Sequence, residues 1–307
     1  MVDKILRSCI FIFMVFSFSL HAETKHRAAA DFFFSDDTDG TETQKYLLGY
    51  ERVFTEEQYF GVHAGVRSYH GEDAPVKDNN FDELKLVGRK NLSQKTYLQG
   101  SISFMDGDSW APELYNATLV HTLNRKWKID GYIDKEILDT ASAIAKQYTI
   151  KTYGATADYT VNEIHAVAAG VYKQSIPDAN SRTGSLLQYT YRPAWFEDGY
   201  FRLRAKQRNS DFDPIEYFSP DSLKQKHAIV GYESVIDQER NIIFKAELGQ
   251  GRQIINGVSE SAEEYILGLR GWIGNETYMD SYYGCTSDGG TSDYSYCYGR
   301  VVFNYLW

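Results

Sequence analysis

Charged and apolar side chains alternate along several stretches of this 307-residue sequence. In the segment FRLRAK (201–206), Arg202, Arg204 and Lys206 each follow an apolar residue. Side chains two positions apart on a β-strand point to the same face, so these three cations would form one row. Such a row can bind and select solutes along an aqueous path. It can also pair with acids on neighbouring strands and hold a wall rigid, and the sequence leaves both interpretations open.

Other segments place polar side chains in the same way. The predicted pore-lining residues are Asp130, Tyr132, Asp134, Arg202, Arg204, Lys206, Lys245, Glu247 and Arg300. Tyrosines on such faces, among them Tyr69, Tyr97 and Tyr132, would offer ring faces for stacking, while carboxylates would bind hydroxyl or amino groups.

Catalytic and metal-binding motifs are missing from the sequence. It contains no HExxH, GxSxG or P-loop pattern, and its histidines are scattered. We therefore predict that the protein is not an enzyme and holds no cofactor or metal ion. The net charge of −10 at pH 7 argues against nucleic acid as a partner, because nucleic-acid binding needs a basic surface.

The first 22 residues have the features of a secretory signal peptide. Lys4 and Arg7 precede an apolar run at 9–20, and Ala22 offers a small residue at the expected cleavage point. No later apolar run approaches the roughly 18 residues that a membrane helix needs. We predict a signal peptide at 1–22 and one mature domain at 23–307.

Two cysteines remain after the predicted cleavage, Cys285 and Cys297. An even pair in an exported protein, separated by a Gly/Ser/Thr/Asp-rich segment, predicts a disulfide.

The mature region repeats one theme, in which about ten alternating residues are followed by a turn. Short turns, as at 55–57 and 93–95, alternate with longer polar segments, as at 35–43, 70–82, 136–147 and 249–263. An even number of strands with connections of this kind is typical of a bacterial outer-membrane barrel. The prediction is an all-β transmembrane antiparallel barrel in the outer membrane of a Gram-negative bacterium, with short periplasmic turns and long extracellular loops. About sixteen strands are expected, at 27–34, 46–54, 59–69, 83–92, 96–104, 114–123, 127–135, 148–161, 164–174, 185–192, 200–208, 226–235, 241–248, 264–273, 277–284 and 296–307.

The chain ends within the last expected strand, where Phe303, Tyr305 and Trp307 share an apolar face. A bare strand edge invites pairing with other chains. We therefore expect this strand to close the barrel against the first one.

Acidic residues are common on the long-loop side, and Lys77, Lys146 and Arg182 only partly offset them. An acidic mouth would attract cationic solutes. Alternatively, these carboxylates recruit calcium beside anionic lipopolysaccharide. The acids are Asp36, Asp37, Asp39, Glu42, Glu72, Asp73, Asp78, Asp106, Asp108, Asp211, Asp213, Glu216, Asp288 and Asp293.

The segment DFDPIEYFSPDSLKQKHAIVGYE (211–233) contains Tyr217, Phe218, Ser219 and Pro220 ahead of an expected strand. It resembles a Tyr-Phe/Tyr-Ser-Pro signature in the barrels of outer-membrane exopolysaccharide exporters of the PgaA, cellulose-exporter and YaiO types. The strand number is similar too, and the terminal aromatics Phe303, Tyr305 and Trp307 resemble the signal that the barrel-assembly machinery recognises. The alternative is an ordinary proline turn before a strand. The large exporters carry a helical-repeat region before the barrel, and this sequence shows only the barrel.

The resemblance implies a pore that translocates or binds a polysaccharide, with an amino-sugar exopolysaccharide of biofilms as the favoured candidate. The expected partners are outer-membrane lipids and lipopolysaccharide, the barrel-assembly machinery, the polysaccharide and periplasmic export proteins. A general or nutrient porin and a non-conducting structural or adhesion barrel remain as alternatives.

Overall fold

The structure, a computed structural model, describes residues 25–55, 57–71, 79–214, 217–287 and 294–307. The predicted signal peptide at 1–22 lies outside these residues, as do Glu72, Asp73, Asp78, Glu216, Asp288 and Asp293 of the predicted acidic mouth.

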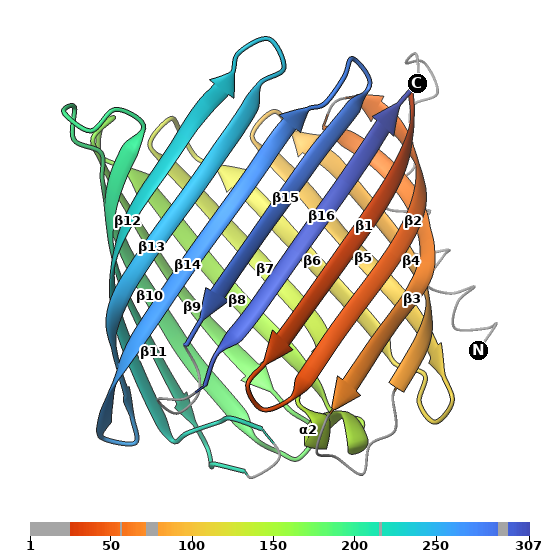
Figure 1. The fold of residues 1–307 in the computed structure, drawn as a ribbon, viewed down its shortest axis with the longest axis vertical. Coiled ribbons are helices and arrows are strands. Elements are labelled where there is room, and N and C mark those ends of the chain that lie inside the picture. Colours follow the sequence, from red (N-terminus) through yellow and green to blue (C-terminus); the bar gives the residue numbers. More distant parts are fainter. Residues whose placement is uncertain (1–24, 56, 72–78, 215–216, 288–293) are drawn as a thin grey trace.

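Sixteen antiparallel strands form one closed barrel, in which every strand pairs with its neighbours in sequence and β1 pairs with β16 (Figure 1). The predicted fold class is confirmed. The strands are β1 (Lys25–Asp37), β2 (Thr41–Thr55), β3 (Gln58–Gly71), β4 (Asn79–Ser93), β5 (Thr96–Gly107), β6 (Glu113–Thr122), β7 (Trp127–Ile137), β8 (Thr149–Thr160), β9 (His165–Ser175), β10 (Ser181–Tyr191), β11 (Gly199–Ser210), β12 (Ser222–Asp237), β13 (Ile242–Ile255), β14 (Val258–Trp272), β15 (Thr277–Thr286) and β16 (Tyr296–Leu306).

Neighbouring residues on a strand meet opposite environments. On β13, Leu248 is 70% exposed on the outer face, whereas Glu247 is 3% exposed on the inner face. Leu48, Val171 and Leu203 are exposed on the outer face as well. In water such a surface would be unfavourable, but lipid accepts it, so the outer face is the lipid-facing one.

Outward aromatic residues gather at both ends of this apolar face, as expected of the aromatic girdles at the two lipid–water interfaces. One girdle lies near the short turns and comprises Tyr50, Trp127, Tyr159, Tyr189, Tyr191, Phe201, Tyr232, Tyr305 and Trp307. The other lies near the long loops and comprises Phe34, Tyr46, Phe104, Tyr115, Tyr153, Tyr265 and Tyr283.

The two ends of the chain close the barrel, as expected. His26 and Trp307 exchange two backbone hydrogen bonds of 3.0 Å, and the ring of Trp307 stacks on His26. Phe303 and Tyr305 face outward beside it. No edge strand is left among the described strands.

Two segments expected to be long loops are tight hairpins instead. β13 and β14 run on to a turn at Asn256-Gly257, where positive φ angles of 49° and 92° suit Asn and Gly. β1 and β2 likewise continue to a turn at 38–40. These predictions at 249–263 and 35–43 were wrong because strands that project beyond the lipid carry polar residues on both faces, and the alternation that marks a lipid-facing strand disappears.

The one α-helix described is α2 (Ala141–Ala145), which lies within the β7–β8 connection. Figure 1 shows it at the end of the barrel opposite the C-terminus. Among the described residues, no helix has the length and apolar character needed to cross a membrane.

Cys285 and Cys297 form a disulfide, as predicted, between directly opposed positions of β15 and β16 with a Cα–Cα distance of 4.0 Å. The bond joins the last strand to its neighbour, one strand away from the closing seam.

Replacing both cysteines by alanine should lower the stability of the folded barrel by at most about 3 kcal/mol, the value for closing a loop of this size. Urea unfolding in lipid vesicles, followed by tryptophan fluorescence, measures the change. Dithiothreitol should destabilise the wild type to the same extent and leave the double variant unaffected. Equal midpoints for oxidised and reduced wild type would contradict a stabilising role.

Candidate functional site: a charged chamber beneath a loop cap

Ion pairs cover much of the inner wall. Glu247 accepts from Arg202 at 3.1 Å and from Lys245 at 2.8 Å, and it also accepts a hydrogen bond from Tyr200. Arg204 reaches from β11 to Glu264 on β14. These predicted pore-lining residues are therefore paired with charges of opposite sign on the wall.

The remaining predicted residues also take inward positions. Arg300 pairs with Asp31 at 2.7 Å. Asp130 lies 3.6 Å from Lys128 and accepts from Thr156 at 3.2 Å. Lys206 follows Arg204 on the inner face of β11. The ring of Tyr132 lies against Gly154, where a Cβ atom would come within 2.2 Å of it, so that ring is held against the wall.

The inner face is in contact with water. The side chains of Arg270 and Lys128 are 50% and 45% exposed although both point inward. A barrel of this size has room for an aqueous lumen, and half-exposed inward charges are what such a lumen requires.

The segment that carries the Tyr-Phe-Ser-Pro residues folds into the mouth at the long-loop end. Tyr217 is 4% exposed and Ser219 is fully buried. Asn180 donates to Tyr217 Oη at 3.0 Å and to Ser219 Oγ at 3.2 Å. Arg182 donates to Ser219 Oγ at 2.8 Å and to the Phe218 carbonyl at 3.0 Å. Residues 217–220 therefore form the turn before β12, and hydrogen bonds from Asn180 and Arg182 hold this turn in place.

Tyr217 is held from both sides. Its hydroxyl donates to Asp178 at 2.5 Å, and its ring packs with Leu138, Ala143 and Ile176. Burial, and next the hydrogen bond to Asp178, raise the pKa of Tyr217 well above its ordinary value. The hydroxyl therefore stays protonated at physiological pH and keeps its role as a donor.

The helix α2 joins this segment to the opposite part of the mouth. Ala143 packs with Tyr217, whereas Ile144 packs into a second apolar cluster with Tyr69, Phe81 and Met105. We call α2 and residues 217–220 together the cap. Tyr69, expected to offer a stacking face, is instead buried in the second cluster, because the β7–β8 connection folds inward over it.

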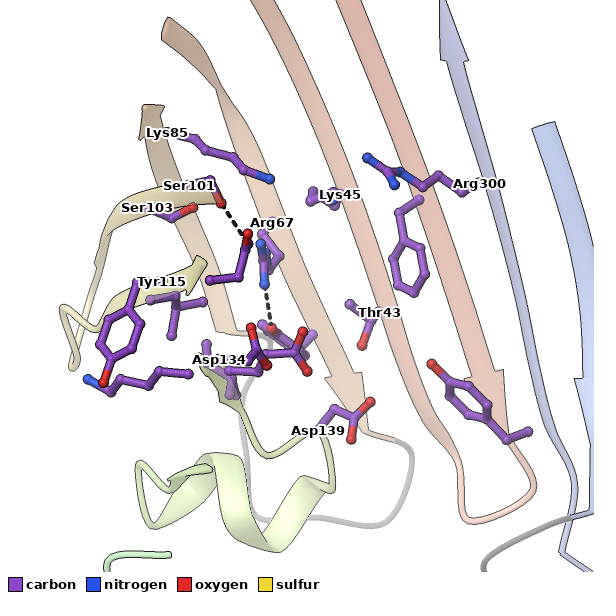
Figure 2. Close-up of a pocket in the computed structure, with 18 of the residues that line it drawn as sticks. Thr43, Lys45, Arg67, Lys85, Ser101, Ser103, Tyr115, Asp134, Asp139 and Arg300 are labelled. Carbon is purple, nitrogen blue, oxygen red and sulfur yellow. Dashed lines mark hydrogen bonds between the residues drawn. The ribbon is translucent and has the colours of Figure 1, made fainter. Parts of the chain in front are cut away.

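Figure 2 shows α2, one part of the cap, beside a chamber of about 410 Å³, which is within the usual size range of small-ligand sites. Its lining residues belong to β1–β7, the β7–β8 connection, β15 and β16 and include no cap residue. Figure 2 shows Lys45, Lys85 and Arg300 deeper in the barrel and Asp134 and Asp139 nearer to α2. Cations therefore line the inner part of the chamber, and acids line the part next to the mouth.

The charge balance differs between the two parts. The cations in the inner part are Lys45, Arg67, Lys85 and Arg300, and two acids accompany them, with Asp31 at 3.1 Å from Lys45 and Glu83 at 2.9 Å from Arg67. A fifth cation, Lys135, lines the part next to the mouth but takes an outward position on β7. The acids near the mouth are Asp134, Glu136 and Asp139. Along the chamber, a solute would thus pass from a net positive to a net negative region.

Hydroxyl, amide and aromatic groups also line the chamber, namely Thr43, Ser101, Ser103, Asn116, Phe33, Tyr282 and Tyr296, and the remaining lining residues are Tyr69, Leu114, Tyr115 and Ile137. Such groups hydrogen-bond and stack, but within the described ranges no set of three or more His, Cys, Asp or Glu side chains is placed to hold a metal ion.

The sequence located only part of this site. Of the predicted residues, Asp134 and Arg300 line the chamber, whereas Arg202, Arg204, Lys245 and Glu247 belong to separate ion pairs on β11, β13 and β14. Lys45 follows the same period-2 alternation and could have been found from it. Asp139 follows β7 in an irregular connection, so no periodicity marks it.

Comparison with known proteins reveals fold similarity alone. No family model matches the sequence, and no curated protein matches it. A solved structure named "Bacterial polysaccharide outer membrane secretin" is similar with a TM-score of 0.68 and 10% identity, covering 94% of this chain and 100% of that one. Pseudomonas aeruginosa OccK7 (OpdD) is similar with a TM-score of 0.50 and 11% identity, covering 94% and 99%. With its lipid-facing exterior, the chain is an outer-membrane β-barrel of the Gram-negative type.

Replacing Tyr217 by alanine should loosen the cap and raise the single-channel conductance, because the change removes two hydrogen bonds and a buried ring. Truncating a large buried aromatic residue typically costs about 3–5 kcal/mol of folding free energy. Here the change would destabilise the loop rather than the strands. Tyr217→Phe keeps the ring and should give a smaller change. Unaltered conductance in Tyr217→Ala, with normal heat-modifiable migration on gels, would show that the cap does not limit the path.

Proposed function

We propose that the barrel is an outer-membrane pore that translocates or binds a polysaccharide, and that amino sugars are its preferred units. The single observation that carries this proposal is the chamber under the cap. It combines hydroxyl, amide, aromatic and separated charged groups in a space suited to a few sugar units.

Each kind of lining group matches a part of such a polymer. Phe33, Tyr282 and Tyr296 offer apolar ring faces, while Ser101 and Ser103 offer hydrogen bonds to hydroxyl groups. The acids near the mouth would attract free amines. The paired cations deeper in the barrel would keep such a chain from binding tightly along its whole length, and passage needs weak binding at several sites.

The likeness to the polysaccharide secretin supports this proposal through the fold only, and the Tyr-Phe-Ser-Pro resemblance points the same way. In this account the chemistry is transport rather than catalysis, and separate periplasmic proteins would bring the polymer to the barrel.

A general or nutrient porin is the second candidate, since the OccK7 likeness and a charged lumen fit it as well. Single-channel recording of the refolded mature chain separates the candidates. Current blocked by micromolar to millimolar glucosamine oligosaccharides, and less by neutral glucans, is the expected result. Steady current that ignores both sugars would favour a porin. A folded barrel without current would contradict both transport functions and leave a structural or adhesive one.

The acids near the mouth should determine the sugar preference. The triple variant Asp134→Asn, Glu136→Gln, Asp139→Asn should weaken block by glucosamine oligosaccharides about tenfold, because neutral amides replace the carboxyl groups that attract amines. Neutral glucans should block it as they block the wild type. Asp158→Asn, a change on the inner face near the short turns, is the matched control and should behave like the wild type. Equal loss in both variants would contradict a chamber-specific role.

A further inference from the structure

The outer face changes from apolar to polar at the same height on most strands near the long loops. On β12, Val230 and Ala228 are followed by Lys226 and Lys224, and on β1, Phe34 is followed by Asp36. These residues occupy outward positions in the register, and the long-loop aromatic girdle borders the row on β1, β2, β5, β6, β8, β14 and β15. The first polar row therefore stands at the level of lipid headgroups.

The charges in this row are divided by sign. Over β1–β6 the outward charges are Asp36, Glu42, Asp82, Asp106 and Glu113, the acidic arc. Over β7–β13 the outward charges are all basic, and we call them the basic arc. They are Lys135, Lys151, Lys173, Lys224, Lys226 and Arg252. The acidic residue Glu263 on β14 marks the end of this arc. Between the basic residues, β10 and β11 contribute Thr183, Ser185, Gln207 and Asn209.

Register brings members of the basic arc together. Lys226 stands directly opposite Arg252 on β13, and Lys224 lies two residues along the same face of β12. Across β8 and β9, Lys173 pairs with Tyr153, next to Lys151 on the same face. Lys151, Lys173, Lys224, Lys226 and Arg252 are all exposed.

A groove of about 600 Å³ opens below the basic arc on the same outer wall. Its floor is made of small or aliphatic residues, among them Ala157, Ala169, Val171, Leu187 and Ala205, and Lys224 and Lys226 stand at its end. Because the floor is apolar and its rim is cationic, the groove suits a hydrocarbon chain that is attached to an anionic headgroup.

We propose that this wall binds a phosphorylated glycolipid of the outer leaflet, that is, lipopolysaccharide. Its phosphates lie against the basic arc, an acyl chain lies in the groove, and the hydroxyl and amide side chains of β10 and β11 bind its sugars. Short turns mark the periplasmic side of such barrels, so the basic arc, near the long loops, faces the leaflet where this lipid resides. The acidic arc gives the opposite wall no such attraction.

Native mass spectrometry of the purified barrel in detergent tests the site, with bisphosphorylated lipid A and its dephosphorylated form as probes. The variant Lys224→Gln, Lys226→Gln, Arg252→Gln should bind bisphosphorylated lipid A on the order of a hundredfold more weakly, at about tenfold or less per charge removed. Asp36→Asn, Asp82→Asn, Asp106→Asn on the acidic arc is the matched control and should bind no more weakly than the wild type.

A second pair of variants tests the groove. Ala169→Phe with Ala205→Phe should weaken lipid A binding about tenfold by excluding a few methylene groups, while binding of the deacylated phosphoglycan stays unchanged. Ala64→Phe, an outward position on β3, serves as the control. All variants are checked for heat-modifiable migration.

Three results would overturn the proposal. These are wild-type affinity in the basic-arc variant, equal affinity of the wild type for the phosphorylated and dephosphorylated lipids, and an equal loss in the acidic-arc control.

Discussion

The structure depends on one constraint, that every backbone N–H and C=O group within the lipid must find a partner in the protein. A sheet meets this condition only when it closes, and here closure comes from the pairing of β1 with β16. The pairing uses the last residues of the chain, down to the hydrogen bonds between His26 and Trp307. The terminal aromatic residues therefore belong to the seam, and the disulfide between β15 and β16 reinforces the strand that forms it.

Closure also divides each strand into two chemical faces. The outer face must be apolar across the hydrocarbon layer, so charges are confined to the lumen and to the outward rows at the level of the headgroups and beyond. In the lumen most of them neutralise one another, as Arg202, Lys245 and Glu247 do. The chamber under the cap differs because its cations and acids lie at different depths, and the inward fold of the β7–β8 connection encloses them. On the outer face, the row of charged residues near the long loops is acidic on one side of the barrel and basic on the other.

Period-2 alternation was enough to predict the barrel, the strand number, the closing seam and the inward direction of residues such as Asp134 and Arg300. It failed at 249–263, where both faces of the hairpin carry polar residues and the pattern vanishes. It could not predict the chamber either, because Asp139 and the cap lie in irregular connections whose path depends on packing. Tyr217 is an example: its sequence context suggested a special turn, but only the contacts with Asn180, Asp178 and α2 show how it is held. The division of the outward charges into an acidic and a basic arc could be recognised only from the register of all the strands.

We propose that the polymer is recognised in the chamber under the cap. The decisive experiment is a structure of the barrel with a bound glucosamine oligosaccharide. We expect sugar density between Asp134 and Arg300, with an amine near Asp134 or Asp139 and a ring against Phe33, Tyr282 or Tyr296. Sugar bound only elsewhere in the lumen, or none at saturating concentration in a conducting barrel, would contradict it.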